Sequence, residues 1–241
     1  MPAAENTRPL RADALRNSTR ILRAARDAFI ERGAAAPLDD IARRAGVGIG
    51  TLYRRFPDRQ VLMRAVVLDA LAHTREVAGR ALLEESTGFE ALVRYMHAVL
   101  DVRVSAVIPV LLDEIDLDDD EIGPAREASA HAVERIIDTA HGDGSLAEVI
   151  TFGDIGTLLV RLSRPLPGPI PPGLNDQLAH RHLDLLIEGL RPSSGRLDEV
   201  GGPALSRRDL GEIRAGSAGR VAEVGEGVAE LPEHVADEGQ G

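Results

Sequence analysis

Apolar residues recur along this chain every three or four positions, which is the spacing of one face of an α-helix. No stretch shows the two-residue alternation of a half-buried strand, so the pattern predicts an all-α protein. The first predicted helix begins at Asn17 or Ser18, either of which can cap it, and ends at Gly33. Its apolar stripe consists of Ile21, Ala25, Ala28 and Phe29.

Two short helices and a long one are predicted next. Pro37 suits a first helical turn and Gly46 is expected to end the helix, so a short helix is predicted over 38–45. A second short helix is expected over 49–56, and a long helix over 59–83. Because the turn between the two short helices is tight and contains glycine, the pattern predicts a helix-turn-helix.

Helical periodicity continues beyond residue 87. Helices are predicted over 89–107, 124–141, 152–162 and 174–190. Pro109 is expected to interrupt the helical pattern after 107, and the acidic run Asp113–Glu121 is expected to form a loop. The 5 prolines within residues 164–173 exclude a helix there and predict an extended spacer.

Charge is divided unevenly along the chain, although the net charge of −11 argues at first sight against a nucleic-acid partner. Residues 1–64 hold 13 arginines against 7 acidic residues, whereas residues 65–241 hold 15 arginines against 32 acidic residues. A basic head on an acidic body suggests that the head meets phosphate and that the body has another role.

The end of the chain differs from the rest in composition. Residues 192–241 contain 10 of the 24 glycines, no aromatic residue, and 10 acidic residues against 5 arginines. Such a segment buries too little apolar surface to offset its ordering entropy, so a disordered acidic tail is expected; an alternative is that it competes with DNA for the basic head. The expected organisation is then a flexible arm over 1–14, a helix-turn-helix domain over 15–64, a helical domain over 65–191, and this tail.

This chain lacks the residues that several kinds of chemistry require. Cysteine is absent, and no nucleophile motif, phosphate-binding loop or dinucleotide fingerprint is present, so neither enzyme activity nor a cofactor is expected. His180 and His182 diverge on a helix, and the calcium-loop-like run from Asp116 to Glu127 has Glu121 where glycine is required, so no metal site is expected. The absence of a long apolar stretch or signal core predicts a cytoplasmic protein without a membrane partner.

Residues 38–59, LDDIARRAGVGIGTLYRRFPDR, carry the strongest indication of function. Small residues such as Ala42 and Ala45 let the two short helices cross closely, while Leu52 and Phe56 anchor the second helix inward. The remaining positions of that helix are free to face outward: Ile49, Gly50, Thr51, Tyr53, Arg54 and Arg55. Arginine can pair bidentately with guanine in the major groove, and the hydroxyls of threonine and tyrosine suit phosphate oxygens.

A set of residues spread over about 15–65 matches one known pattern. They are Asp40-Ile41-Ala42, Ala45-Gly46-Val47, Gly50-Thr51-Leu52-Tyr53, Phe56-Pro57-Asp58-Arg59 and Leu62. In these residues the chain closely resembles the DNA-binding region of the tetracycline-repressor (TetR) family of bacterial regulators. The resemblance implies that the outward-facing residues named above face DNA and that Arg59 meets a phosphate. Arg43 and Arg44 are further candidates for DNA contact, with plain solvation as an equal alternative.

The chain also departs from the pattern of that family. Ala36, Pro37 and Gly48 stand where residues with a hydroxyl often cap the two short helices. Those caps, and any phosphate contacts that they make, are therefore not expected here; Asp39 replaces only the favourable charge.

The resemblance further implies that the helices beyond residue 65 form a domain for ligand binding and dimerisation. The last two helices would pair in a four-helix interface through Leu158, Leu162, Leu183, Leu186 and Leu190, although at least half of these leucines are equally explained as internal core. A pocket for a mostly hydrophobic effector would be lined by Tyr95, Met96, His97, Val99, Arg103 and His131.

Two functions remain compatible with these residues. The first is a homodimeric, ligand-responsive transcriptional regulator, a repressor that a small molecule releases from a palindromic operator on double-stranded DNA. The second is a small-molecule-binding helical protein or enzyme that retains the fold without operator binding. The basic residues of 1–64 and the outward Tyr53-Arg54-Arg55 favour the first, whereas the acidic overall charge favours the second slightly.

Overall fold

The structure, a computed structural model, describes residues 7–111, 114–116, 119–191 and 201–214. Within these ranges the chain forms helices and no strand, which confirms the predicted all-α class. The helices are α1 (Thr7–Arg32), α2 (Leu38–Ala45), α3 (Ile49–Arg55), α4 (Arg59–Glu84), α5 (Gly88–Asp101), α6 (Val104–Leu111), α7 (Ile122–Gly142), α8 (Phe152–Leu162), α9 (Pro172–Leu190) and α10 (Arg207–Arg214). None of the helices in the described ranges combines the length and the apolar character that crossing a bilayer requires.

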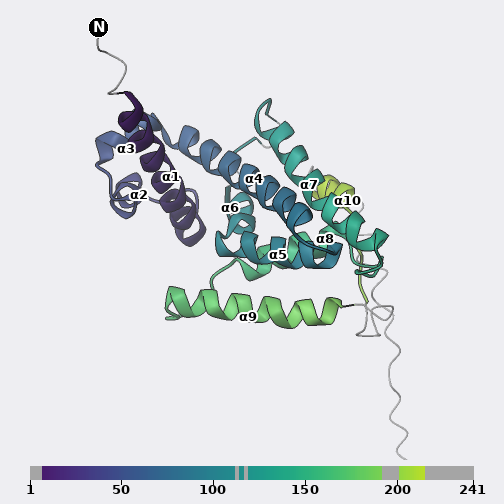
Figure 1. The fold of residues 1–241 in the computed structure, drawn as a ribbon. Helices are drawn as coiled ribbons and strands as arrows, with labels where there is room; N and C mark the ends of the chain where they lie inside the picture. Colours follow the sequence, from purple (N-terminus) through teal and green to yellow (C-terminus); the bar gives the residue numbers. More distant parts are fainter. Residues whose placement is uncertain (1–6, 112–113, 117–118, 192–200, 215–241) are drawn as a thin grey trace, which may run out of the picture.

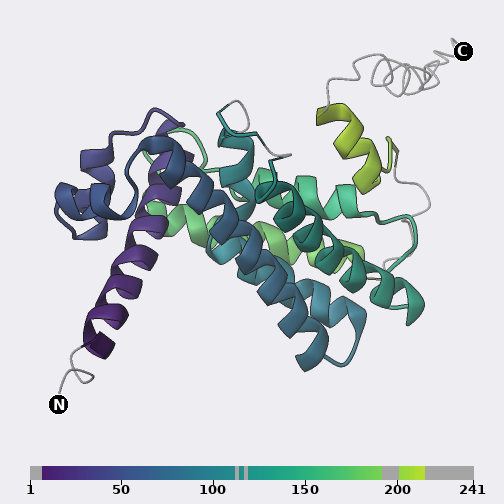
Figure 2. The same ribbon diagram turned by 90° about the horizontal axis from the view of Figure 1, so that it is seen from above.

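Helix α4 connects the two parts of the molecule, as Figures 1 and 2 show. It packs against α1 in the N-terminal part and against α5, α6 and α7 in the larger bundle. Its buried face runs from Leu62 and Met63 to Ala81, so one helix contributes core residues to both parts. Helix α9 lies on the outer side of the bundle, against α5 and α8 (Figure 1).

The helix-turn-helix has the predicted geometry. Helix α2 has the predicted bounds, and α3 ends one residue before the predicted end because Phe56 takes up an extended backbone. Gly46 ends α2 in the left-handed region, with φ 63°, where a side chain would be strained. The amide of Val47 then donates to the carbonyl oxygen of Ala42 over 3.0 Å, which closes the turn. Ile41 and Leu52 are fully buried between the helices.

The region predicted as one helix over 89–107 is divided in the structure. Helix α5 ends at Asp101 and α6 starts at Val104, and between them Arg103 has a positive φ of 48°. Pro109 lies inside α6 and does not end it. Its missing N–H costs α6 one hydrogen bond, but the burial of Val107 and Leu111 keeps this helix against the core.

Residues 7–14 and 201–214 are more ordered than the composition suggested. Helix α1 starts at Thr7, so residues 7–14 are helical and do not belong to a flexible arm. Pro9 suits the first turn of that helix, and the alanines that follow favour its continuation. The expected disordered tail is wrong for residues 201–214, which include α10; residues 192–200 and 215–241 lie outside the described residues.

A local cap explains why α10 forms where the composition predicted disorder. Ser206 and Asp209 form a cap at the start of α10: the Ser206 amide donates to the Asp209 carboxylate over 2.8 Å. A serine followed three residues later by an acid is a known signal for a helix start, and the average composition of the tail concealed it. Helix α10 then packs against α8, which supplies the contacts that an isolated segment of this length lacks.

Candidate nucleic-acid interface and ligand cavity

Helix α3 presents one polar face to solvent because its apolar residues are held inward. Leu52 is fully buried and Phe56, directly after the helix, is 5% exposed. These two anchors leave Tyr53 46% exposed, with Arg54 and Arg55 exposed beside it. Of the other positions predicted to face outward, Gly50 is exposed, whereas Ile49 and Thr51 are half-buried.

The two arginines of α3 have neutral partners. The Arg54 Nη2 donates to the Thr51 hydroxyl over 3.0 Å, and the Arg55 Nε donates to the Ser18 hydroxyl over 2.7 Å. Within the described ranges, neither guanidinium forms an ion pair with a carboxylate. Among the described residues, both guanidinium groups therefore lack an acidic partner, and the terminal nitrogens of Arg55 form no hydrogen bond there.

The two arginines of α2 are engaged by acids. The Arg43 Nη2 donates to Asp40 over 2.5 Å, and the Arg44 Nη2 donates to Glu31 on α1 over 2.6 Å. Hydrogen bonding from Arg32, and then the charge of Arg43, lowers the pKa of Asp40. The hydrogen bond from Arg44 likewise lowers the pKa of Glu31. Both side chains are therefore held by acids within the protein, and Asp40 is shared with Arg32, so that three arginines face two carboxylates.

Arg59 takes part in a structural contact that the sequence did not predict. Its Nη1 donates to the backbone carbonyl oxygens of Ala34 and Ala36, each over 2.6 Å. The side chain is half-buried and ties the start of α4 to the loop between α1 and α2. The phosphate contact that the family resemblance implied for Arg59 stays a prediction and falls to its other N–H groups.

The missing caps are as expected from the sequence. Pro37 and Gly48 occupy the N-cap positions of α2 and α3, and neither helix has a side-chain hydrogen bond at its cap. Asp39 and Asp40 lie in the first turn of α2, where their negative charge favours the helix.

Sequence reasoning missed the residues that hold the helix-turn-helix against α1. The buried Ser18 accepts the bond from Arg55, and the Arg20 Nη2 donates to the carbonyl oxygen of Gly46 over 3.0 Å. These pairs are 37 and 26 residues apart, so no local spacing in the sequence indicates them.

A cavity of about 720 Å³ lies within the bundle, between α4, α5, α6, α7, α8 and α10. Cavities of this size hold drug-sized molecules. Tyr95, a predicted pocket residue, lines it, and the Tyr95 hydroxyl makes no hydrogen bond with any described residue. Burial raises the pKa of Tyr95, so the side chain remains a neutral donor and acceptor.

The other predicted pocket residues lie elsewhere. Met96 and Val99 are fully buried in the core and do not line the cavity. His131 is exposed on α7, where it lies 4.0 Å from Glu134. Periodicity placed all of these on helices that surround the cavity, but it could not distinguish the face towards the cavity from the face towards the core.

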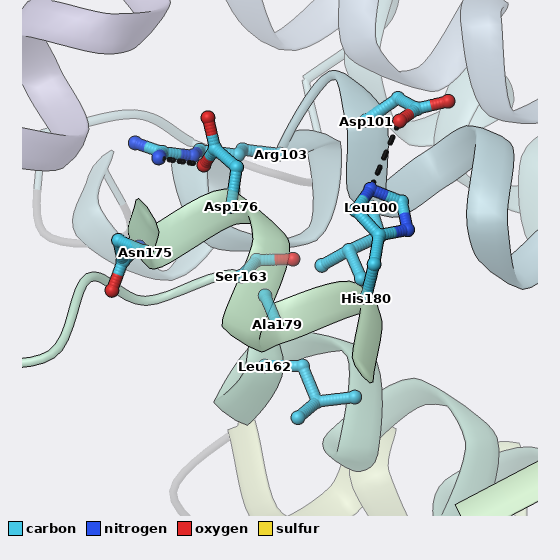
Figure 3. A pocket seen from close by; sticks show the side chains of 9 residues that line it. All are labelled: Leu100, Asp101, Arg103, Leu162, Ser163, Asn175, Asp176, Ala179 and His180. Atoms are coloured by element: carbon cyan, nitrogen blue, oxygen red, sulfur yellow. Dashed lines mark hydrogen bonds and ion pairs between the residues drawn. The ribbon is translucent and has the colours of Figure 1, made fainter. Parts of the chain in front are cut away.

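Arg103 lies in a second, smaller pocket of about 80 Å³ between α5, α8 and α9, shown in Figure 3. Its guanidinium pairs with Asp176. On the other side of the pocket, His180 lies 3.0 Å from Asp101 and stacks on His97, with ring centroids 5.4 Å apart. These polar contacts join α9 to α5.

The candidate interface leucines differ in exposure. Leu183 is fully buried in the core, and Leu158, Leu162 and Leu190 are half-buried against it. Leu186 is 40% exposed. Two further leucines of α9, Leu174 and Leu185, are 47% and 61% exposed and were not among the predicted set.

Known proteins are similar to this chain in sequence and in structure. The sequence profile of the family described as "Bacterial regulatory proteins, tetR family" matches residues 21–66, which run from α1 into α4. The uncharacterized HTH-type transcriptional regulator Rv2250c of Mycobacterium tuberculosis is 39% identical over 83 residues. That alignment covers 34% of this chain and 42% of the relative, so it spans less than half of that protein.

Two solved structures extend the likeness to nearly their whole length. The TetR transcriptional regulator SCO0520 from Streptomyces coelicolor is 30% identical, with a TM-score of 0.53, over 73% of this chain and 98% of that one. The TetR transcription regulatory protein from Mycobacterium vanbaalenii is 31% identical, with a TM-score of 0.54, over 76% of this chain and 99% of that one. With this identity over nearly all of two regulators, and with a helix-turn-helix of the expected geometry, the chain belongs to the TetR family of DNA-binding transcriptional regulators.

Proposed function

We propose that this regulator is a homodimeric repressor that binds a palindromic operator through α3 and releases it when a small molecule occupies the cavity. The observation that carries the proposal is the pair of arginines on α3, Arg54 and Arg55, which stand exposed without an acidic partner in the described part of the chain. An unpaired arginine beside an exposed tyrosine on a short surface helix is suited to bases and phosphates in a DNA groove.

The proposed DNA contact depends on which face of α3 is exposed. With Leu52 turned inward, the opposite face of α3 can enter the major groove, where Arg54 and Arg55 meet base edges or phosphates. The hydroxyls of Thr51 and Tyr53 suit phosphate oxygens. Such contacts release counterions from the DNA, so the affinity falls as salt rises.

The dimer is proposed to form through α8 and α9. Helix α9 carries the exposed leucines Leu174, Leu185 and Leu186, and exposed apolar side chains on one outer helix favour a partner. In a twofold dimer the same patch serves both copies, and two α3 helices about 34 Å apart read two half-sites of a palindrome.

Effector binding is proposed to act through the helices that the cavity and the DNA-binding part share. The cavity is lined by residues of α4 and α6, and both helices also contact α1. A ligand that prefers one arrangement of α4 and α6 therefore biases the position of α1 and of the helix-turn-helix. The size of the response equals the difference in affinity of the ligand for the two arrangements.

The test is a gel-shift assay of the full chain with DNA from upstream of its own gene, alongside selection of bound DNA from a random pool. The expected result is a specific, salt-sensitive complex that protects a palindrome. A protein that is folded and dimeric yet selects no sequence would contradict the proposal and favour a helical ligand-binding protein without operator binding.

A further inference from the structure

We propose that the effector is an apolar molecule with a neutral oxygen acceptor, such as that of a ketone, ester or ether, and that the hydroxyls of Tyr95 and Ser129 are the donors that select it. This inference rests on the proposed effector role of the large cavity and adds the chemistry that the cavity recognises. Tyr95 lines the cavity from α5 and Ser129 from α7, two helices that pack against each other.

Both hydroxyls are buried and unpaired. Tyr95 and Ser129 are each 5% exposed, and neither hydroxyl forms a hydrogen bond within the described part of the chain. Buried polar groups in native proteins nearly always have a partner, so two unpaired hydroxyls on the wall of one cavity require an acceptor inside it. A water molecule can serve when the cavity holds no ligand, and a ligand oxygen replaces that water on binding.

A third buried hydroxyl in the lining shows the contrast. Thr74 is 8% exposed, and its hydroxyl donates to the carbonyl oxygen of Ala70 over 3.0 Å, within α4. Its hydrogen is therefore engaged by its own helix and is not available to a ligand. Among the buried lining residues that the structure describes, only Tyr95 and Ser129 have an O–H group without an acceptor.

The buried part of the lining carries no charged side chain. The described lining residues that are buried are Leu71, Thr74, Tyr95, Val104, Ser129 and Val133. Every charged residue of the described lining is half-buried or exposed and belongs to α7 or α10. A charged ligand group in the buried part would lose its hydration without gaining an opposite charge from the residues around it. The group that meets Tyr95 is therefore neutral and is carried by an apolar body.

Tyr95 acts as a donor at neutral pH. Burial raises the pKa of its hydroxyl, so the proton stays on the oxygen. A hydroxyl has a single hydrogen, and ketone, ester and ether oxygens accept such a hydrogen. A hydrocarbon of the same shape would leave both hydroxyls unpaired. A site built to hydrogen-bond its ligand discriminates against an analogue without the polar atom for this reason.

The stability of the unliganded protein tests whether the Tyr95 hydroxyl is unpaired. Tyr95→Phe keeps the ring and removes only the oxygen. Because this oxygen has no partner among the described residues, we expect the thermal midpoint of the variant to equal or exceed that of the wild type. A midpoint lower by several degrees would show that the hydroxyl is paired within the protein, and would overturn the proposal.

The ligand chemistry is tested by equilibrium dialysis of the full chain with three probes that share one ring system: 2-acetylnaphthalene, 2-ethylnaphthalene and 2-naphthoate. Tyr95→Phe should weaken binding of the ketone by about fivefold, the usual contribution of one neutral hydrogen bond. It should leave the affinity for the hydrocarbon unchanged, because that probe has no acceptor. It should also leave the affinity for naphthoate unchanged, because the carboxylate stays at the exposed part of the lining.

Two further variants complete the dialysis experiment. Ser129→Ala should weaken binding of the ketone and not of the hydrocarbon. Thr74→Val is the matched control: it removes a buried hydroxyl from the same lining, but one whose hydrogen is already engaged, so the affinity for the ketone should be kept.

Three results would overturn the proposal. One is no binding of the ketone by the wild type, and another is an equal effect of Tyr95→Phe on the ketone and the hydrocarbon. The third is a loss of naphthoate binding in Tyr95→Phe as large as that of the ketone, which would show that the acceptor is not required to be neutral. An unchanged affinity of Ser129→Ala for the ketone would remove Ser129 from the selective site.

Operator binding without any probe, measured on the same preparations, separates the two proposals. If the wild type selects DNA but its affinity for the ketone does not depend on Tyr95, only the inference about the two hydroxyls fails. If the ketone binds through Tyr95 but no operator is bound, the proposed repressor function fails and the ligand site stands.

Discussion

Helices α2 and α3 each carry two adjacent arginines in their last turn, and the two pairs differ in what surrounds them. Arg43 and Arg44 on α2 are bound by Asp40 and Glu31, whereas Arg54 and Arg55 on α3 bind the hydroxyls of threonine and serine. The two pairs have the same residue type and spacing, but among the described residues only the α3 pair lacks an acidic partner.

This difference supports the proposal that α2 and α3 have separate roles in the motif. The ion pairs of Asp40 with Arg32 and of Glu31 with Arg44 hold α2 against α1, and the acids partly offset the charge of the α2 arginines. The neutral partners of α3 orient two guanidinium groups without cancelling them. Orientation without neutralisation is what bidentate recognition of bases and phosphates requires.

The largest expected effect comes from removing the α3 pair. Arg54→Ala with Arg55→Ala should weaken operator binding by at least about thirtyfold, because each good arginine contact contributes about 1–3 kcal/mol. The dependence of affinity on salt should also flatten, by about one unit of slope for each phosphate that the variant no longer binds. Fluorescence anisotropy across a salt series measures both, with thermal unfolding as the control for folding. An unchanged affinity would remove α3 as the reading helix.

A smaller effect should follow when Arg55 is kept but its support is removed. Ser18→Ala deletes the buried hydroxyl that accepts from the Arg55 Nε, so the guanidinium loses its orientation but not its charge. Operator affinity should fall by about threefold and stability by about 1 kcal/mol, the usual size of a hydrogen-bond contribution. If Ser18→Ala binds the operator as well as the wild type, charge alone explains the role of Arg55.

A still smaller effect is expected for the α2 pair. Arg43→Ala with Arg44→Ala should change operator affinity by less than about threefold and stability by less than about 1 kcal/mol, because exposed ion pairs contribute little. The same anisotropy and unfolding measurements apply. A loss as large as that of the α3 double variant would show that the acids do not withhold these arginines from DNA.

The smallest effect is a flat pH profile. The lowered pKa values of Asp40 and Glu31 keep both acids ionised above their ordinary values of 3.8 and 4.5, so the α2 ion pairs are fully present there. These pairs break only as pH falls through the lowered values. The ratio of operator affinities between the wild type and the Arg43→Ala, Arg44→Ala variant should therefore stay constant from about pH 8 to about pH 5. A ratio that changes across this range would show that the acids titrate there.

The sequence predicted the parts of this molecule that local signals determine. Pro37 and Gly46 bracket α2, and Leu52 with Phe56 sets the inward face of α3, so the bounds and orientation of the helix-turn-helix followed from residues a few positions apart. The pair of Asp40 and Arg43, three residues apart on one helix, was also within reach of such reasoning.

The rest depends on contacts between distant residues. Glu31 meets Arg44, and Ser18 meets Arg55, only because α1 crosses the helix-turn-helix. In the same way α10 is fixed by Gly153 and Glu127, far from it in sequence, so a glycine-rich acidic composition pointed to disorder where docking produces a helix. Tyr95 lines the cavity, whereas the neighbouring Met96 is buried in the core. This difference also depends on how the helices pack, so the sequence alone did not indicate it.

The most direct test of the difference between α2 and α3 is chemical modification of arginines by phenylglyoxal, read by mass spectrometry with and without the selected operator. Arg54 and Arg55 should react readily in the free protein and become protected on the DNA, while Arg43 and Arg44 react slowly in both states. Protection of Arg43 and Arg44 with no change at Arg54 and Arg55 would contradict the assignment of α3 as the helix that meets DNA.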